Sequence, residues 1–151
     1  MLARTRKSMA EKDQGFTLIE LLVVMIIIGI LAAIAIPVFL NQRKRAVDSS
    51  IKSDLRSIAN QMETYYTDNQ VYVLPTQAGT GGDVTVGSDT VKVSGTNLYT
   101  FKLLSNATTS TTTASSATGY CVTGSGNGKG SGSTITYNSL TGGLGSTACP
   151  T

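Results

Sequence analysis

Residues 21–40 read LLVVMIIIGILAAIAIPVFL and contain no charged or hydrogen-bonding side chain. At a rise of about 1.5 Å per residue, about 20 such residues form a helix long enough to cross the hydrocarbon core of a membrane. The run separates a polar leader (1–15) from a polar remainder (about 41–151). It therefore predicts a membrane-crossing helix within an apolar stretch at about 16–40.

The composition excludes several classes of enzyme. The 151 residues include no His, no Trp, two Cys and only 14% charged residues, and the formal charge is +3. Without His, a Ser-His-Asp triad, a Cys-His pair and a His-based zinc site are ruled out, and two cysteines cannot form a four-thiolate site. The length allows one domain with a modest core, and we expect no catalytic, metal or cofactor site.

Two ordinary interpretations of the apolar stretch remain open. A secretory signal peptide has the same layout, because Ala33-Ile34-Ala35 forms a small-x-small cleavage pattern. A single-pass anchor also fits, but the positive-inside rule does not orient it. Four basic residues precede the run and five follow it: Arg4, Arg6, Lys7 and Lys12, then Arg43, Lys44, Arg45, Lys52 and Arg56.

Glu20 distinguishes the stretch from both interpretations. It lies in the first turns of the apolar segment, after Phe16-Thr17-Leu18-Ile19. A carboxylate inside a membrane helix costs about 2.5–3.5 kcal/mol on insertion scales. The apolar stretch offers no cation, so we expect the neutralising group to come from another chain or from a newly formed amino terminus.

The motif Gly15-Phe16-Thr17-Leu18-Ile19-Glu20, between a basic leader and an apolar helix, resembles the N-terminal signal of type IV pilins and pseudopilins. The resemblance implies that a prepilin peptidase cuts between Gly15 and Phe16 and N-methylates Phe16. It also implies a helical filament in which the Phe16 ammonium neutralises Glu20 of a neighbour. Because either charge is costly when left alone in an apolar core, this pair would fix the axial register.

Gly29 and Pro37 weaken the predicted helix locally. Glycine costs about 1 kcal/mol relative to alanine in a helix interior, and Pro37 removes the hydrogen bond to the carbonyl of Ala33. A kink in a membrane helix is one interpretation. The resemblance implies another, compatible one, in which residues 29–37 unwind as subunits pack into a filament.

The helix is predicted to continue beyond the membrane, over 41–72. Its apolar positions are spaced by four, four, three, four and three residues, and its opposite face is polar, with Asp54 assigned to the polar side. A helix from Phe16 to about Asp68 would be about 80 Å long, and the rest of the chain must cover its stripe. The apolar positions are Val47, Ile51, Leu55, Ile58, Met62 and Tyr65.

Residues 73–151 are predicted to form the globular part. Short β-branched and aromatic runs between Asp83 and Tyr137 predict one antiparallel sheet of three to five strands with one face on the helix. The Ser/Thr-rich segment 106–118 and the Gly/Ser-rich segment 124–132 are expected to be exposed loops. The fold class is thus α+β, with a long N-terminal helix packed by its second half on the sheet, as the resemblance to type IV pilins also implies.

Cys121 and Cys149 are the only possible disulfide pair. In an oxidising compartment we expect them to join and to hold a Gly-rich C-terminal segment to a strand. The resemblance supports this expectation, because many pilins close a C-terminal loop in this way.

The favoured function is a major-type pilin that polymerises into a type IV pilus. The alternatives are a pseudopilin of a type II secretion or competence system and, more remotely, a secreted or anchored surface-binding protein. The resemblance implies prepilin peptidase, an assembly platform and an ATPase as partners, with the precursor in the cytoplasmic membrane and the product at the cell surface. Without residues 1–15 the charge is 8 − 7 = +1, and we predict no clear nucleic-acid site.

Overall fold

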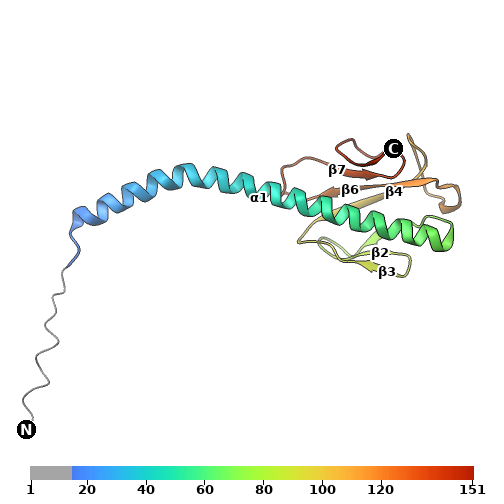
Figure 1. Ribbon diagram of the computed structural model, residues 1–151, viewed down its shortest axis with the longest axis horizontal. Coiled ribbons are helices and arrows are strands. Elements are labelled where there is room, and N and C mark those ends of the chain that lie inside the picture. The colour runs from blue at the N-terminus through green and yellow to red at the C-terminus, as the bar shows by residue number, and fades with distance from the viewer. Residues whose placement is uncertain (1–14) are drawn as a thin grey trace, which may run out of the picture. The chain divides into compact units, whose positions relative to one another are not determined.

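The computed structural model describes residues 15–151, so the predicted leader lies outside the described residues except for Gly15. The described chain divides into two units, one that ends at residue 39 and one that comprises residues 40–151. One helix, α1 (Leu18–Asn69), contributes to both, and all the strands belong to the second unit. Figure 1 shows the strands beside the C-terminal part of α1.

The end of α1 is set by its last turn. Gln70 adopts a left-handed backbone conformation, with φ of 57°. Its backbone N–H donates to the carbonyl of Tyr66 at 2.7 Å, and its side-chain amide donates to the carbonyl of Thr67 at 3.1 Å. These bonds satisfy carbonyl groups that have no partner within the helix. The observed end at Asn69 is one residue beyond Asp68 and three residues before the end of the predicted continuation, 41–72.

The predicted apolar stripe of the helix forms the core of the second unit. Ile51, Leu55, Ile58 and Met62 are at most 1% exposed, and Val47 and Tyr65 are half-buried beside them. Together they pack on valines of one sheet and on tyrosines and aliphatic residues of the other. The spacing of the stripe therefore identified the buried face of α1.

The predicted single sheet is in fact two antiparallel sheets. The first has the order β1-β2-β3, formed by Thr76–Gln77, Val84–Val86 and Asp89–Val91. The second has the order β5-β4-β6-β7-β8. Its strands are β4 (Leu98–Asn106), β5 (Thr109–Thr111), β6 (Gly119–Ser125), β7 (Ile135–Asn138) and β8 (Gly143–Gly145).

The two expected loops are partly ordered into secondary structure. Segment 106–118 contains β5, which forms a hairpin with β4, and a short 3-10 helix at Ala114–Ser116. The first residues of segment 124–132 complete β6, and the following turn packs on α1, where Ser131 donates its backbone N–H to Asp48. Runs of Ser, Thr and Gly hid these elements because they carry little apolar periodicity.

Alternation along β4 and β6 separates the two faces of the larger sheet. Tyr99 and Leu103 of β4 lie on the face toward α1, as do Tyr120 and Val122 of β6. Tyr120 reaches the helix directly, because its hydroxyl donates to the backbone carbonyl of Ala59 at 3.2 Å. The sheet also comes close to the helix at Gly124, where a Cβ atom would lie 2.5 Å from Ile51 Cγ2, so glycine is needed there for steric reasons.

Asp54 is buried, which corrects its assignment to the polar side of the helix. Asp54 is 5% exposed, and its carboxylate accepts four hydrogen bonds, three from the segment between the two sheets and one from β4. Ser94 donates through its backbone N–H and its hydroxyl, Asn97 through its amide, and Tyr99 through its hydroxyl at 2.7 Å. Burial, together with the hydrogen bond and charge of Asp54, raises the pKa of Tyr99 far above its ordinary value.

This network explains why the strands split into two sheets. The residues that bind Asp54 follow β3 and lead into β4, and among them Gly95 has a left-handed φ of 60°. Their polar groups turn toward the helix instead of extending a strand. Gln77 of β1 then joins the sheets, since its side chain accepts the N–H of Tyr99 and donates to the carbonyl of Asn97.

Replacing Asp54 tests this account. Asp54→Ala leaves four donors without their acceptor, and each unsatisfied buried group costs about 1–3 kcal/mol. We expect a large loss in the free energy of unfolding, although alanine favours helix more than aspartate does. Asp54→Asn should lose less, because its amide oxygen can still accept. The measurement is urea unfolding of the detergent-solubilised chain, followed by the near-ultraviolet circular dichroism of tyrosine.

Asp48→Ala is the matched control on the same helix. It removes a carboxylate that accepts one exposed hydrogen bond, from the N–H of Ser131, so its effect should be small. Equal stability of the Asp54→Ala and Asp48→Ala chains would contradict the role given to Asp54.

Candidate functional site

The start of α1 contains a capping box. Thr17 precedes the helix, and Glu20 stands three residues later. The N–H and the hydroxyl of Thr17 donate to Glu20 Oε2 at 2.9 and 2.8 Å, and the N–H of Glu20 donates to Thr17 Oγ1 at 3.3 Å. This reciprocal arrangement satisfies donors that a helix start otherwise leaves free.

The capping box gives Glu20 hydrogen-bond donors within its own chain, while a neutralising cation from another chain or a new amino terminus remains a prediction. Both Thr17 donors reach Oε2, whereas Oε1 takes part in no hydrogen bond among residues 15–151. The carboxylate is thus oriented by its own helix but keeps its negative charge and one open acceptor atom. Thr17 was missed as a site residue, although the pattern Thr-x-x-Glu at 17–20 signals such a cap.

The apolar residues that follow are uncovered by the chain itself. From Leu18 to Leu40 the large apolar side chains are 47–87% exposed, and Phe16 is 79% exposed. By length and composition, α1 contains one segment able to cross a membrane, and none of that segment is buried within the protein. Another molecule, either lipid or protein, must cover so large an apolar surface.

Gly29 and Pro37 both lie inside α1, which the structure continues through both positions. A Cβ atom added at Gly29 would meet nothing within 4 Å. Packing within the chain therefore does not explain this glycine. The flexibility of residues 29–37 remains a prediction.

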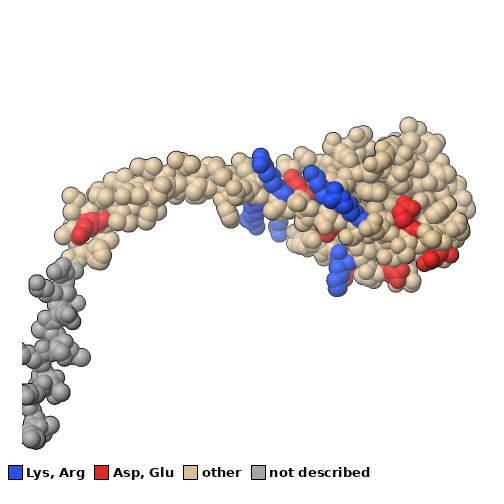
Figure 2. All heavy atoms as spheres, viewed as in Figure 1, with Lys and Arg blue, Asp and Glu red and all other residues tan. Residues whose placement is uncertain are grey.

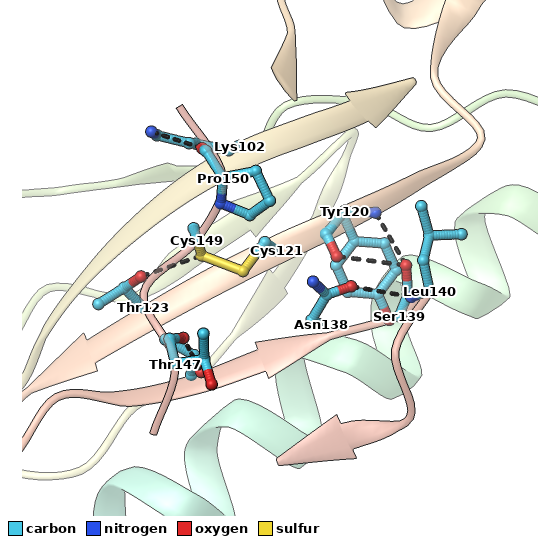
Figure 3. Close-up of a disulfide and its surroundings, with 11 residues drawn as sticks. Lys102, Tyr120, Cys121, Thr123, Asn138, Ser139, Leu140, Thr147, Cys149 and Pro150 are labelled. Atoms are coloured by element: carbon cyan, nitrogen blue, oxygen red, sulfur yellow. Dashed lines mark hydrogen bonds between the residues drawn. A yellow bond between two sulfur atoms is a disulfide. The ribbon is translucent and has the colours of Figure 1, made fainter. Parts of the chain in front are cut away.

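The predicted disulfide is confirmed, and it fastens the C-terminal segment to the outer face of the larger sheet. Cys121 of β6 bonds to Cys149, with Cα atoms 5.8 Å apart. Lys102 of β4 donates to the carbonyl of Pro150 and Thr136 of β7 to the carbonyl of Thr147, both at 2.8 Å. Figure 3 shows these contacts on three strands around the disulfide. They leave Cys121 only 1% exposed.

Two grooves lie beside residues 44–56 of α1. The first, of about 500 Å³, lies between α1 and the segment that carries β7 and β8, and Lys52 and Arg56 line it. The second, of about 370 Å³, lies beneath the Gly-rich turn and includes Lys44. Hydroxyl groups of Ser131 and Ser133 border both grooves.

Comparison with known proteins identifies both parts of the chain. Residues 12–36 match the family model described as "Prokaryotic N-terminal methylation motif". Residues 37–133, more than half of the chain, match the model described as "Type IV minor pilin ComP, DNA uptake sequence receptor".

Curated relatives agree over about 60 residues. The type IV wide pilus major component PilA4 of Thermus thermophilus is 49% identical over 39% of this chain and 45% of its own length. The type IV major pilin protein PilA of Myxococcus xanthus is 41% identical over 40% of this chain and 28% of its own. The type II secretion system core protein G of Escherichia coli is 36% identical over 41% and 43%. The chain spans less than half the length of each of these three relatives.

Removal of the disulfide should destabilise the second unit. A closed loop of 28 residues contributes about 3–4 kcal/mol in the loop-entropy account. We therefore expect a loss of that size when the chain is unfolded in urea with a reductant, or when Cys121→Ala and Cys149→Ala are combined. Reductant should have no effect on the double variant. Unchanged stability of the wild-type chain, with two thiols titrating, would contradict the role of this bond.

Proposed function

The chain belongs to the family of the type IV minor pilin ComP, whose members and relatives are structural subunits rather than enzymes. We propose that it polymerises in bulk into a type IV pilus, as the major pilins among its relatives suggest. Prepilin peptidase would first cut between Gly15 and Phe16 and methylate the new amine of Phe16. The precursor would lie in the cytoplasmic membrane and the filament at the cell surface.

One observation carries the proposal most directly: the apolar half of α1 is uncovered along its whole length, with a single carboxylate near its start. Lipid can cover such a segment before assembly. In a filament the same segments of neighbouring copies would cover one another, because apolar side chains that leave lipid must meet other apolar side chains. A soluble, unassembled subunit would expose all of them to water.

The geometry of Glu20 supports its proposed role in register. Oε2 is occupied by the two donors of Thr17, so the carboxylate is held in one orientation. Oε1 is then free to accept the methylated Phe16 ammonium of an adjoining copy. A subunit out of step would leave both charges unpaired in an apolar core, which costs several kcal/mol more than the paired state.

The relatives include both major pilins and secretion core proteins, so a pseudopilin is the alternative. Two features favour a pilin. The C-terminal segment is closed by a disulfide, and residues 90–151 contain no Asp or Glu that could form a calcium loop. Long surface fibres containing this chain, seen by negative-stain microscopy of normally expressing cells, are the expected outcome, and their absence would favour the pseudopilin.

Glu20→Gln separates the charge from the helix cap. Glutamine can still accept from Thr17, because capping boxes form with either residue, but it cannot neutralise an ammonium. We expect normal membrane insertion and leader cleavage, with sheared filaments lost or strongly reduced. Glu20→Ala should behave alike in assembly while also losing the cap. Wild-type filament yield from Glu20→Gln would contradict the register mechanism.

Mass spectrometry of the wild-type amino terminus completes this experiment. The expected first residue is methylated Phe16. A first residue of Ile36 would indicate ordinary signal-peptide cleavage after Ala35 and would overturn the proposed processing.

A second candidate function is DNA binding, which the family description names and which the sequence did not predict. The groove between α1 and β8 favours it, because Lys52 and Arg56 there outnumber the one carboxylate in the lining, Asp48, and lie beside serine and threonine residues. Such groups contact phosphates. The combined change Lys52→Ala and Arg56→Ala should weaken salt-dependent binding of filaments to duplex DNA and lower the salt slope by about two. Lys92→Ala is the control. Failure of wild-type filaments to retain DNA at physiological salt would eliminate this candidate.

A further inference from the structure

The charges of the second unit are separated along α1. Three consecutive basic residues, which we call the basic collar, stand at its N-terminal end: Arg43, Lys44 and Arg45. Three acidic residues, which we call the acidic end, stand at the other: Glu63, Asp68 and Asp89. All six are exposed, and Asp89 lies beside the helix because it accepts a hydrogen bond from Gln61. In Figure 2 acidic side chains gather at the far end of this unit, whereas basic side chains lie at its start and over its middle, with one acidic side chain among them.

Neither group is neutralised within the described part of the chain. Among residues 15–151 the one ion pair within 4.0 Å joins Lys92 to Asp83, at 3.4 Å. The acidic end receives only hydrogen bonds from neutral groups: Gln61 to Asp89, and the Tyr72 hydroxyl to Glu63 at 3.3 Å. The collar and the acidic end are therefore open to opposite charges from outside the subunit.

The position of the collar is unusual for an inserted chain. It follows directly after the apolar segment, on the side opposite the leader, and Lys and Arg are depleted on the translocated side of membrane segments. Because three cations on that side disfavour translocation, we expect them to have a function that outweighs this cost. After loss of the leader the net charge is only +1, so the collar does not belong to a general surplus of positive charge that would attract polyanions.

The separation of the two groups matches the length of the apolar segment. Along the helix, Arg45 to Glu63 spans about 27 Å and Arg43 to Asp68 about 38 Å at about 1.5 Å per residue. The apolar segment 21–40 spans about 30 Å by the same measure. A parallel copy displaced by about 30 Å would therefore bring its collar level with the acidic end of the first copy.

We propose that the basic collar of one subunit docks against the acidic end of an adjacent copy displaced by about 30 Å along the helix axis. This inference rests on the proposed assembly into a filament. The contact determines which axial displacements between two subunits are allowed more than how tightly the subunits bind. Complementary charges mainly exclude wrong arrangements. It supplies a second register device, outside the apolar core, in addition to Phe16 and Glu20.

Charge exchange in the full-length chain tests the contact, in cells that assemble the wild-type filament. The variant Arg43→Glu with Arg45→Glu should lower the yield of sheared filaments by about tenfold or more, since like charges then face one another. Asp68→Lys with Asp89→Lys should do the same. The chain that carries all four changes should recover most of the yield. Lys92→Glu, a charge reversal at a side chain that is 90% exposed, is the control and should assemble normally.

Cysteine cross-linking provides an independent readout. Arg43→Cys combined with Glu63→Cys, which a displacement of about 30 Å brings to the same level, should give ladders of cross-linked subunits in sheared filaments. Arg43→Cys combined with Lys92→Cys should not.

Each other outcome overturns the proposal in a recognisable way. Normal yield from both reversed variants would show that the charges do not meet. Loss without recovery in the four-fold variant, with normal amounts of subunit in the membrane, would assign the collar to lipid headgroups. If the four-fold variant recovers its filament yield only when duplex DNA is added, the collar would be assigned to nucleic acid. If wild-type cells make no filaments at all, the proposed function fails instead.

Discussion

The rest of the structure depends on a single helix that must bury two different surfaces. A helix cannot cover its own apolar side chains, so each surface needs a partner. Beyond residue 40 the partner is the chain itself, which places two sheets against Ile51, Leu55, Ile58 and Met62. Before residue 40 no described part of the chain provides one. The part of α1 after residue 40 thus serves folding of the chain, and the part before residue 40 is left for contacts with other molecules.

Periodicity and composition predicted the parts of the fold that are governed by apolar burial. The buried face of α1, its end near Asn69, the α+β class and the Cys121–Cys149 pair all followed from spacing or from the small number of candidates. The division into two sheets did not, because it depends on where the polar groups of Ser94 and Asn97 turn. Their target, Asp54, looks like any exposed helix aspartate in sequence, and only the loop that folds over it buries it.

The same limit applies to the assembly site. Glu20 was identified because a carboxylate in an apolar segment is expensive, and that cost predicts a neutralising cation from another chain or a new amino terminus but does not point to Thr17. The hydrogen bonds from Thr17 are local and require only the pattern Thr-x-x-Glu. The charge separation between the basic collar and the acidic end was also present in the sequence. Its meaning depended on the structure, which leaves both groups without an ion pair among the described residues.

Strand β6 is the central member of the larger sheet, and two adjacent residues on it fasten different layers. Tyr120 holds the helix through Ala59, and Cys121 holds the C-terminal segment on the opposite face. A slip of the strand by a single residue would reverse the two directions, pointing a phenol outward and a thiol at the helix. The register of β6 is thus fixed twice, by a hydrogen bond on one face and by a disulfide on the other, and neither can replace the other.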